Sequence, residues 1–156
     1  MSASDNTPPP SRSRARSAAR LAAVQALYQR EMEGAEVPAL LHEFHQHRLG
    51  AVIDDVEYAE AEVAFFDDLV AGAVARADEI DAAIAARLAS GWTLARLDKS
   101  MKAILRCGAY ELLARPDVTR ATVISEYVDV AKAFYDKRET GFVNGLLDAI
   151  AGEVRA

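Results

Sequence analysis

The sequence predicts an all-α protein in which about seven amphipathic helices pack into one compact bundle. A chain of 156 residues is long enough for one domain with a real core, and too short for a second catalytic domain. Apolar residues make up 51% of the chain, mean hydropathy is -0.02, and Gly and Pro are sparse, which suits a compact helical protein. Apolar residues also recur at spacings of three and four through most of the chain, and no segment alternates convincingly as a strand would.

The N-terminal segment divides into a tail and a helix. Residues 1–13 are predicted to be disordered, because they contain three consecutive prolines, several Ser and Thr, and no large aliphatic side chain beyond Met1. The helical domain follows over residues 14–156. Its first helix is expected from about residue 14 to Gly34, with an apolar stripe of Leu21, Val24, Leu27, Tyr28 and Met32.

Three helices are expected in the middle of the chain. Pro38 opens a short one over residues 38–49, and a longer one covers about 56–76. Its predicted core residues are Val63, Phe66, Val70 and Val74. A fourth helix covers about 79–89 and stops at Ser90 and Gly91, after which Thr93 can cap the next segment.

Three further helices are expected in the C-terminal half. The fifth ends before Pro116, the sixth spans about residues 122–134 and the seventh about 139–154. Their predicted core positions are Met101, Ile104, Leu105, Gly108 and Leu112 in the fifth, Ile124, Tyr127 or Val128, and Ala131 in the sixth, and Val143, Leu146, Leu147 and Ile150 in the seventh.

Charge is distributed unevenly along the chain. The net charge is -6, yet residues 1–20 carry +3, residues 21–30 carry +1, residues 31–81 carry -12 and residues 82–156 carry +2. Such asymmetry allows one face to attract phosphate while another repels it or receives a basic protein. The acidic stretch is explained equally well by solubility alone.

Several classes of function are excluded by what the sequence lacks. Cys107, the only cysteine, cannot form an internal disulfide and is expected to be a small buried residue. No Gly-rich phosphate loop and no Ser or Cys beside a His is found, and His42, His45 and His47 do not complete a metal site. We therefore expect no enzyme activity, cofactor or metal. Without a membrane span or a secretory signal, a cytoplasmic location is expected.

Two groups of basic residues are candidates for phosphate contact. Arg14, Arg16 and Arg20 begin the first helix, where positive charge opposes the helix dipole, and Arg16 and Arg20 share a face. Lys99, Lys102 and Arg106 form a stripe on the fifth helix, with no acid between them on that face. Because these three cations repel one another, they predict either a polyanion or an acidic neighbour.

The run from Asp117 to Asp148 resembles the C-terminal signature of the NusB family. The resemblance begins at Asp117-Val118, continues through Ile124-Ser125-Glu126 and Ala131-Lys132-Ala133-Phe134, and closes with Phe142-Val143-Asn144-Gly145 and Leu147-Asp148. Residues 102–106 and 109–112 look like the family's central helix, and residues 16–28 look like its Arg-rich first helix. The matches together span roughly residues 16–154.

The resemblance implies a fold of two small helical subdomains and an RNA-binding role in transcription antitermination. Members of the NusB family pair with NusE, a small-subunit ribosomal protein, bind the boxA element of the nascent ribosomal RNA leader rather than DNA, and help RNA polymerase to read through terminators. By this resemblance Arg14, Arg16 and Arg20 would neutralise phosphates, and Lys99, Lys102 and Arg106 would extend the basic track. Tyr28 or Phe142 would support an unstacked base, although each is equally well read as a core residue.

The chain departs from the family pattern at two places. Ser17 and Ala18 interrupt the arginines of the first helix, and Gly141 stands where a basic residue often precedes Phe142. Two alternatives stay open: a protein interaction module whose acidic surface docks a basic partner, and a detached relative of the NusB-like domain of RNA cytosine methyltransferases.

Overall fold

The computed structural model describes residues 12–46 and 56–155. Within these ranges its regular secondary structure consists of α-helices, one 3₁₀ turn and two π-helical residues after α2, without a strand. The elements are α1 (Arg12–Glu33), α2 (Val37–Phe44), α3 (Val56–Ala75), α4 (Ala77–Ala85), η3 (Leu94–Arg96), α5 (Lys99–Ala114), α6 (Arg120–Lys132) and α7 (Lys137–Val154). The prediction of about seven helices is confirmed. Residues 1–11 of the predicted tail and residues 47–49 of the predicted second helix lie outside the described ranges.

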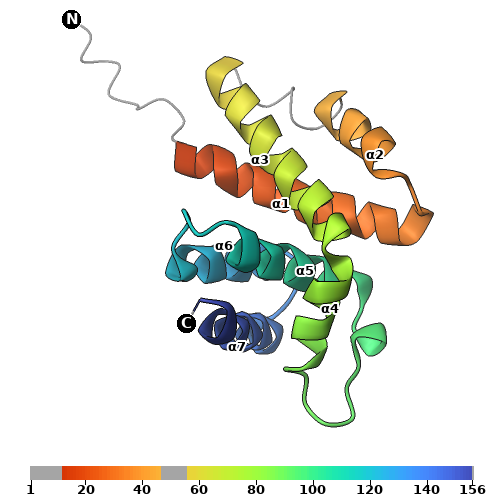
Figure 1. Cartoon of the computed structure of the whole chain (residues 1–156), viewed down its shortest axis with the longest axis vertical. Coiled ribbons are helices and arrows are strands. Elements are labelled where there is room, and N and C mark those ends of the chain that lie inside the picture. Colours follow the sequence, from red (N-terminus) through yellow and green to blue (C-terminus); the bar gives the residue numbers. More distant parts are fainter. Residues whose placement is uncertain (1–11, 47–55, 156) are drawn as a thin grey trace, which may run out of the picture.

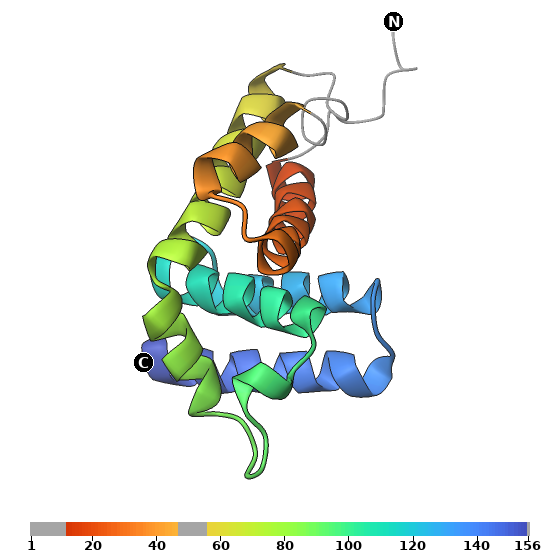
Figure 2. The same cartoon turned by 90° about the vertical axis from the view of Figure 1, so that its right-hand side faces the viewer.

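The helices form two groups that meet along α1 and α5. Helices α1, α2 and α3 make the N-terminal group, and α4, α5, α6 and α7 make the C-terminal one, as Figures 1 and 2 show. Helix α1 packs on α3 within its own group and on α5 across the boundary. This arrangement agrees with the two helical subdomains that the family resemblance implies. No helix in the described ranges has the length and apolar character needed to cross a bilayer.

Local capping explains where several helices start. The Asp98 carboxylate accepts a hydrogen bond from the Met101 amide at 2.8 Å at the start of α5, and the Thr119 hydroxyl accepts one from the Thr122 amide at 3.2 Å in α6. Helix α6 therefore begins two residues before the predicted position. Helix α4 starts at Ala77, directly after α3, and ends at Ala85, four residues before the expected end.

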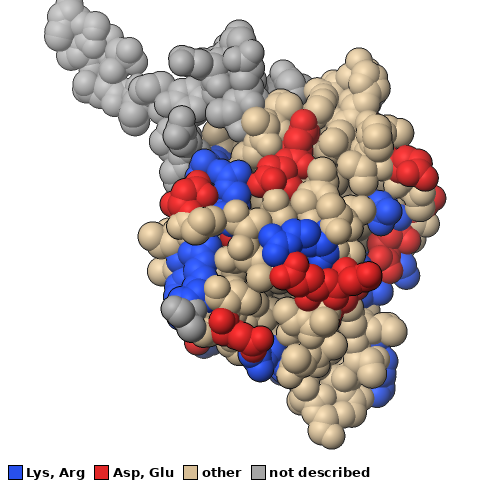
Figure 3. Space-filling model, in the orientation of Figure 1, with Lys and Arg blue, Asp and Glu red and all other residues tan. Residues whose placement is uncertain are grey.

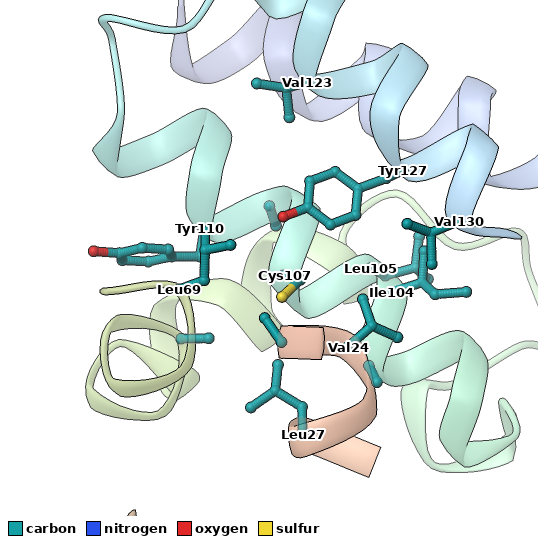
Figure 4. Close-up of a cluster of buried hydrophobic side chains, with 14 of the residues drawn as sticks. Val24, Leu27, Leu69, Ile104, Leu105, Cys107, Tyr110, Val123, Tyr127 and Val130 are labelled. Carbon is teal, nitrogen blue, oxygen red and sulfur yellow. The ribbon is translucent and has the colours of Figure 1, made fainter. Parts of the chain in front are cut away.

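The core lies between α5 and the helices around it. All five predicted core positions of α5 are buried, and the same holds for the predicted core positions of α7. Figure 4 shows Tyr127 of α6 reaching over α5 toward Cys107, with Val24 and Leu27 of α1 on the other side. Cys107 is fully buried as expected, and this burial raises the pKa of its thiol to about 12.

Helix α1 buries a different face from the one that its large apolar residues predicted. Leu21, Tyr28 and Met32 are exposed, whereas only Val24 and Leu27 of the predicted stripe are buried. The buried face of α1 is completed by Ala15, Ala19, Ala22, Ala23 and Ala26. Alanines allow helix axes to approach closely, so α1 can lie against both α3 and α5 although its buried side chains are small.

Candidate nucleic-acid interface

The first turns of α1 present two arginines on the surface. Arg14 is exposed, and Arg16 is partly exposed with its guanidinium 4.7 Å from the centroid of the Phe65 ring on α3. The Arg16 Nη1 lies 3.8 Å from the Asp117 Oδ2, so a carboxylate partly balances this charge. Figure 3 shows Lys and Arg side chains beside acidic ones near the start of α1. Arg14 and Arg16 are therefore the arginines of this helix end whose side chains reach the surface.

Arg20 lies in the protein interior instead. Its side chain is 3% exposed, and its Nε and Nη2 donate to both oxygens of Glu111 at distances of 2.7 to 3.2 Å. The Nη1 donates to Glu126 at 2.9 Å. Burial by itself would lower the pKa of Arg20, but the hydrogen bonds and charge of Glu111 outweigh this effect and raise it. A guanidinium so enclosed does not reach a phosphate, so Arg20 is removed from the set of expected RNA contacts.

The basic stripe of α5 has acidic neighbours, which is one of the two outcomes expected for it. The Lys102 Nζ lies 3.0 Å from Glu31 of α1, and Arg106 pairs with Asp81 of α4 at 2.9 Å and with Glu31 at 3.1 Å. The hydrogen bond from Lys102 is the main reason that the pKa of Glu31 is lowered. Lys99, at the first turn of α5, is exposed. Of the three cations, Lys102 and Arg106 are thus paired with carboxylates, and Lys99 is the exposed one.

Tyr28 and Phe142, the two expected base-stacking residues, line separate grooves. Tyr28 is 40% exposed in a groove that it shares with Gln25 and Gln29 of α1 and with Phe134 in the turn after α6. Phe142 is 37% exposed and belongs to a second groove. Both rings are accessible, whereas the alternative interpretation of Tyr28 and Phe142 as core residues predicted that they would be buried.

The second groove, which we call the Trp92 groove, runs from the segment after α4 to the start of α7. It is lined by Trp92, Arg96, Met101, Tyr135, Arg138 and Phe142, together with Leu88, Ala89, Leu97, Asp98 and Glu139. The Arg96 guanidinium stands 5.2 Å from the centre of the Trp92 ring, and Trp92 is 53% exposed. The Tyr135 hydroxyl donates to Asp98, the cap of α5, at 2.5 Å. Apart from Phe142, the sequence offered one signal for this groove, a lone tryptophan in a Gly-containing loop.

The corner between α5 and α6 places Asp117 beside Arg16. Arg155 holds this corner, because its guanidinium donates to the carbonyl oxygens of Leu112 at 3.0 Å, Arg115 at 2.8 Å and Val118 at 2.6 Å. Those carbonyls lie at or beyond the end of α5, where helix acceptors lack internal partners. The Arg115 side chain in turn donates to Asp117 at 3.2 Å, and this contact is the main cause of the lowered pKa of Asp117. Sequence reasoning missed this charge next to the arginines.

Together these features define an all-helical, two-subdomain protein with an arginine-bearing helix end, two aromatic grooves and, within its described residues, no group of three metal-binding side chains. The family model for the NusB family matches residues 17–152. The chain therefore belongs to the NusB family.

Relatives and solved structures agree with this assignment. The chain is 71% identical to the transcription antitermination protein NusB of Sphingopyxis alaskensis, across 92% of this chain and 97% of the relative. It is 67% identical to the protein of the same name from Novosphingobium aromaticivorans, across 91% and 96%. Its fold is similar to T. maritima NusB, with a TM-score of 0.73, 30% identity and coverage of 88% and 91%. It is also similar to a chain of the antitermination factors NusB and NusE in complex with dsRNA, with a TM-score of 0.74, 28% identity and coverage of 90% and 98%.

Proposed function

We propose that this protein is a transcription antitermination factor that binds the boxA element of the nascent ribosomal RNA leader together with NusE. In the cytoplasm it would promote read-through by RNA polymerase in ribosomal RNA operons, with no catalytic step of its own. The observation that carries the proposal is the 71% identity, along almost the full length of both chains, to a protein named for transcription antitermination. A similar solved structure that contains NusB, NusE and RNA supports the two kinds of partner.

The RNA contacts that we propose differ in strength. Arg14, Arg16 and Lys99, which reach the surface, would meet phosphates, and each neutralised phosphate of a single strand adds about 0.7 to the salt slope of binding. Lys102 and Arg106 would contribute less, since their charges are already balanced by Glu31 and Asp81. In addition to these contacts, the exposed rings of Tyr28 and Phe142 offer faces on which unstacked bases can stack.

The Trp92 groove is the surface that we propose for the partner protein. Exposed aromatic and Arg side chains in one apolar depression are typical of the centre of a protein interface. Trp92, Phe142 and Arg96 provide them here. RNA that reaches Phe142 would then run along the edge of the bound partner, which gives a physical reason for joint binding.

The alternative of an acidic docking surface has less support. Several carboxylates of the acidic stretch are used inside the molecule: Glu31 and Asp81 pair with α5, and Asp68 pairs with Arg115 at 3.0 Å. Each such pair removes a charge that a basic partner would need. The docking surface would have to be formed by the other acidic residues of the stretch, without Glu31, Asp81 and Asp68.

Fluorescence anisotropy would test the proposed function. A boxA-like single-stranded RNA and a scrambled control are each titrated with the protein, with and without NusE, at several salt concentrations. We expect a preference for the boxA-like RNA that increases when NusE is present. Equal and weak binding of both RNAs, accompanied by tight binding of NusE, would support the interaction module instead.

Two variants separate the proposed surfaces. Replacing Arg14 and Arg16 by Gln should reduce the salt slope by about 1.4, which corresponds to two phosphates, and leave NusE binding intact. Trp92→Ser should weaken NusE binding at low salt while the RNA affinity of the protein alone stays unchanged. If Trp92→Ser binds NusE normally, the partner surface lies elsewhere.

A further inference from the structure

A buried polar network connects α1 to the C-terminal helices. The Arg20 guanidinium binds Glu111 of α5 through two donors and Glu126 of α6 through a third. The Tyr127 hydroxyl donates to Glu111 at 2.9 Å, and the Ser17 hydroxyl donates to Glu126 at 2.5 Å. Arg20 and Glu111 are both almost completely buried. One arginine thus links three helices in the interior of the protein.

Such a network is a poor device for stability alone. Removing two charges from water is costly, and apolar side chains of similar size often stabilise a core equally well or better. What a forked guanidinium–carboxylate contact offers is direction, because its donors and acceptors pair in only one arrangement. The network is therefore better explained by a need for one fixed position of α1.

Apolar packing does not supply that position at the start of α1. Among the described side chains of α1 that precede Arg20, the only buried ones are Ala15 and Ala19. The larger buried residues of this helix, Val24 and Leu27, lie beyond Arg20. Two methyl groups bury little area and interlock weakly, so they do little to fix the first turns of the helix. A slip of one residue would move its side chains by 1.5 Å along the axis and 100° around it.

We propose that Arg20 is a positioning residue for RNA binding: its contacts with Glu111 and Glu126 fix the register of α1 and so hold Arg14 and Arg16 where they meet phosphates. This inference rests on the proposed function, and it gives Arg20 a role other than direct contact. Arg16 lies one turn before Arg20, and both guanidinium groups stand over the same Phe65 ring, at 4.7 and 5.1 Å from its centroid. A shift of Arg20 would therefore be passed directly to Arg16.

Two variants that keep the net charge test the proposal. Arg20→Lys keeps the charge and loses the fork. A triple variant, Arg20→Met, Glu111→Leu and Tyr127→Phe, removes one positive and one negative charge and leaves no buried polar atom of these three side chains unpaired. The matched control is Arg87→Met with Glu153→Leu, which removes an exposed ion pair between the turn after α4 and helix α7.

Each variant is measured for the salt slope of RNA binding, for NusE affinity as a check on folding, and for amide hydrogen exchange. If Arg20 positions α1, both network variants bind NusE normally and their salt slope falls by about 1.4, because the contacts of Arg14 and Arg16 are both lost. At 0.15 M salt this is a loss of roughly tenfold in RNA affinity. Amides of residues 15–19 exchange faster, those of α7 are unchanged, and adding Arg16→Gln to the triple variant has little further effect.

Other outcomes overturn the proposal. Native RNA affinity and slope in folded network variants would mean that Arg20 serves packing alone. A slope reduced by about 0.7, with unchanged exchange in α1, would mean that Arg20 itself contacts a phosphate. If the unmodified protein shows no preference for boxA-like RNA, the proposed function fails. The exchange measurement then still decides whether Arg20 fixes α1, because it requires no RNA.

Discussion

Asp117→Asn should make the protein bind RNA more tightly, although the substitution adds no contact. The Asp117 carboxylate is 52% exposed, lies 3.8 Å from the Arg16 guanidinium and accepts hydrogen bonds from Arg115. It therefore competes with an incoming phosphate for the charge of Arg16. Asparagine keeps an oxygen that can accept from Arg115, so the corner between α5 and α6 should retain its shape.

The size of the effect follows from the geometry. Two unit charges 3.8 Å apart interact by about 1 kcal/mol in a medium as polar as water. Measured exposed ion pairs contribute about 0.2–1 kcal/mol, because solvent and salt screen them. The charge released on Arg16 should thus tighten RNA binding by about 1.4- to fivefold at low salt. The gain should shrink as salt rises and the screening length falls.

The assay is RNA anisotropy at low and moderate salt, with Glu153→Gln as the control. Glu153 is an exposed carboxylate that is paired with Arg87, on the helix layer farthest from α1 in Figure 2. Both substitutions raise the net charge by one, so any difference between them reports the local effect at Arg16. The reasoning is refuted if Asp117→Asn binds RNA no more tightly than Glu153→Gln, or if its advantage does not change with salt.

Three further predictions concern stability. Gly72→Ala should destabilise the fold by about 1–3 kcal/mol in urea unfolding, because an added Cβ would lie 2.1 Å from the Tyr110 ring. If the stability of the variant is unchanged, α3 and α5 can separate without an energetic cost. In the same assay Gly145→Ala should stabilise by about 0.5–1 kcal/mol, since its Cβ meets no atom within 4 Å and alanine favours the helix; a loss of stability would contradict this. The pKa of Glu31 is lowered in the folded protein, so its ionised carboxylate stabilises the fold above the ordinary pKa of 4.5, and this contribution disappears as pH falls through the lowered pKa. The Glu31→Gln variant should therefore lose less stability on acidification than the unmodified protein. If the stability of both proteins falls in parallel with pH, the ion pair with Lys102 is contradicted.

Helix positions were largely predictable from the sequence because they depend on local periodicity. The stripe of α5 and the apolar positions of α7 identified their buried faces correctly. The face of α1 was not predictable in this way. Leu21, Tyr28 and Met32 mark a helix face by their hydrophobicity, but alanine is compatible with a core, a surface or a helix contact. Only the close approach of α3 and α5 selects the alanine face.

The candidate site shows the same division. Arg14, Arg16 and Arg20 are equivalent in sequence, yet the first two reach the surface and the third is buried. The partners that bury Arg20 are 91 and 106 positions away in the chain, so no local pattern reveals them. One of the two expectations for Lys102 was an acidic neighbour, and the structure confirms it. That this neighbour is Glu31 follows only from the packing of α1 on α5.

The sequence by itself determined the helical class, the membership of the NusB family and the basic character of the first helix, because each is written in residue type and spacing along the chain. Tertiary structure alone decided which arginine is buried inside the protein, which carboxylate lies beside Arg16 and where the aromatic side chains form grooves. These are contacts between distant segments. Their energies depend on distance and burial, which exist only once the helices have packed.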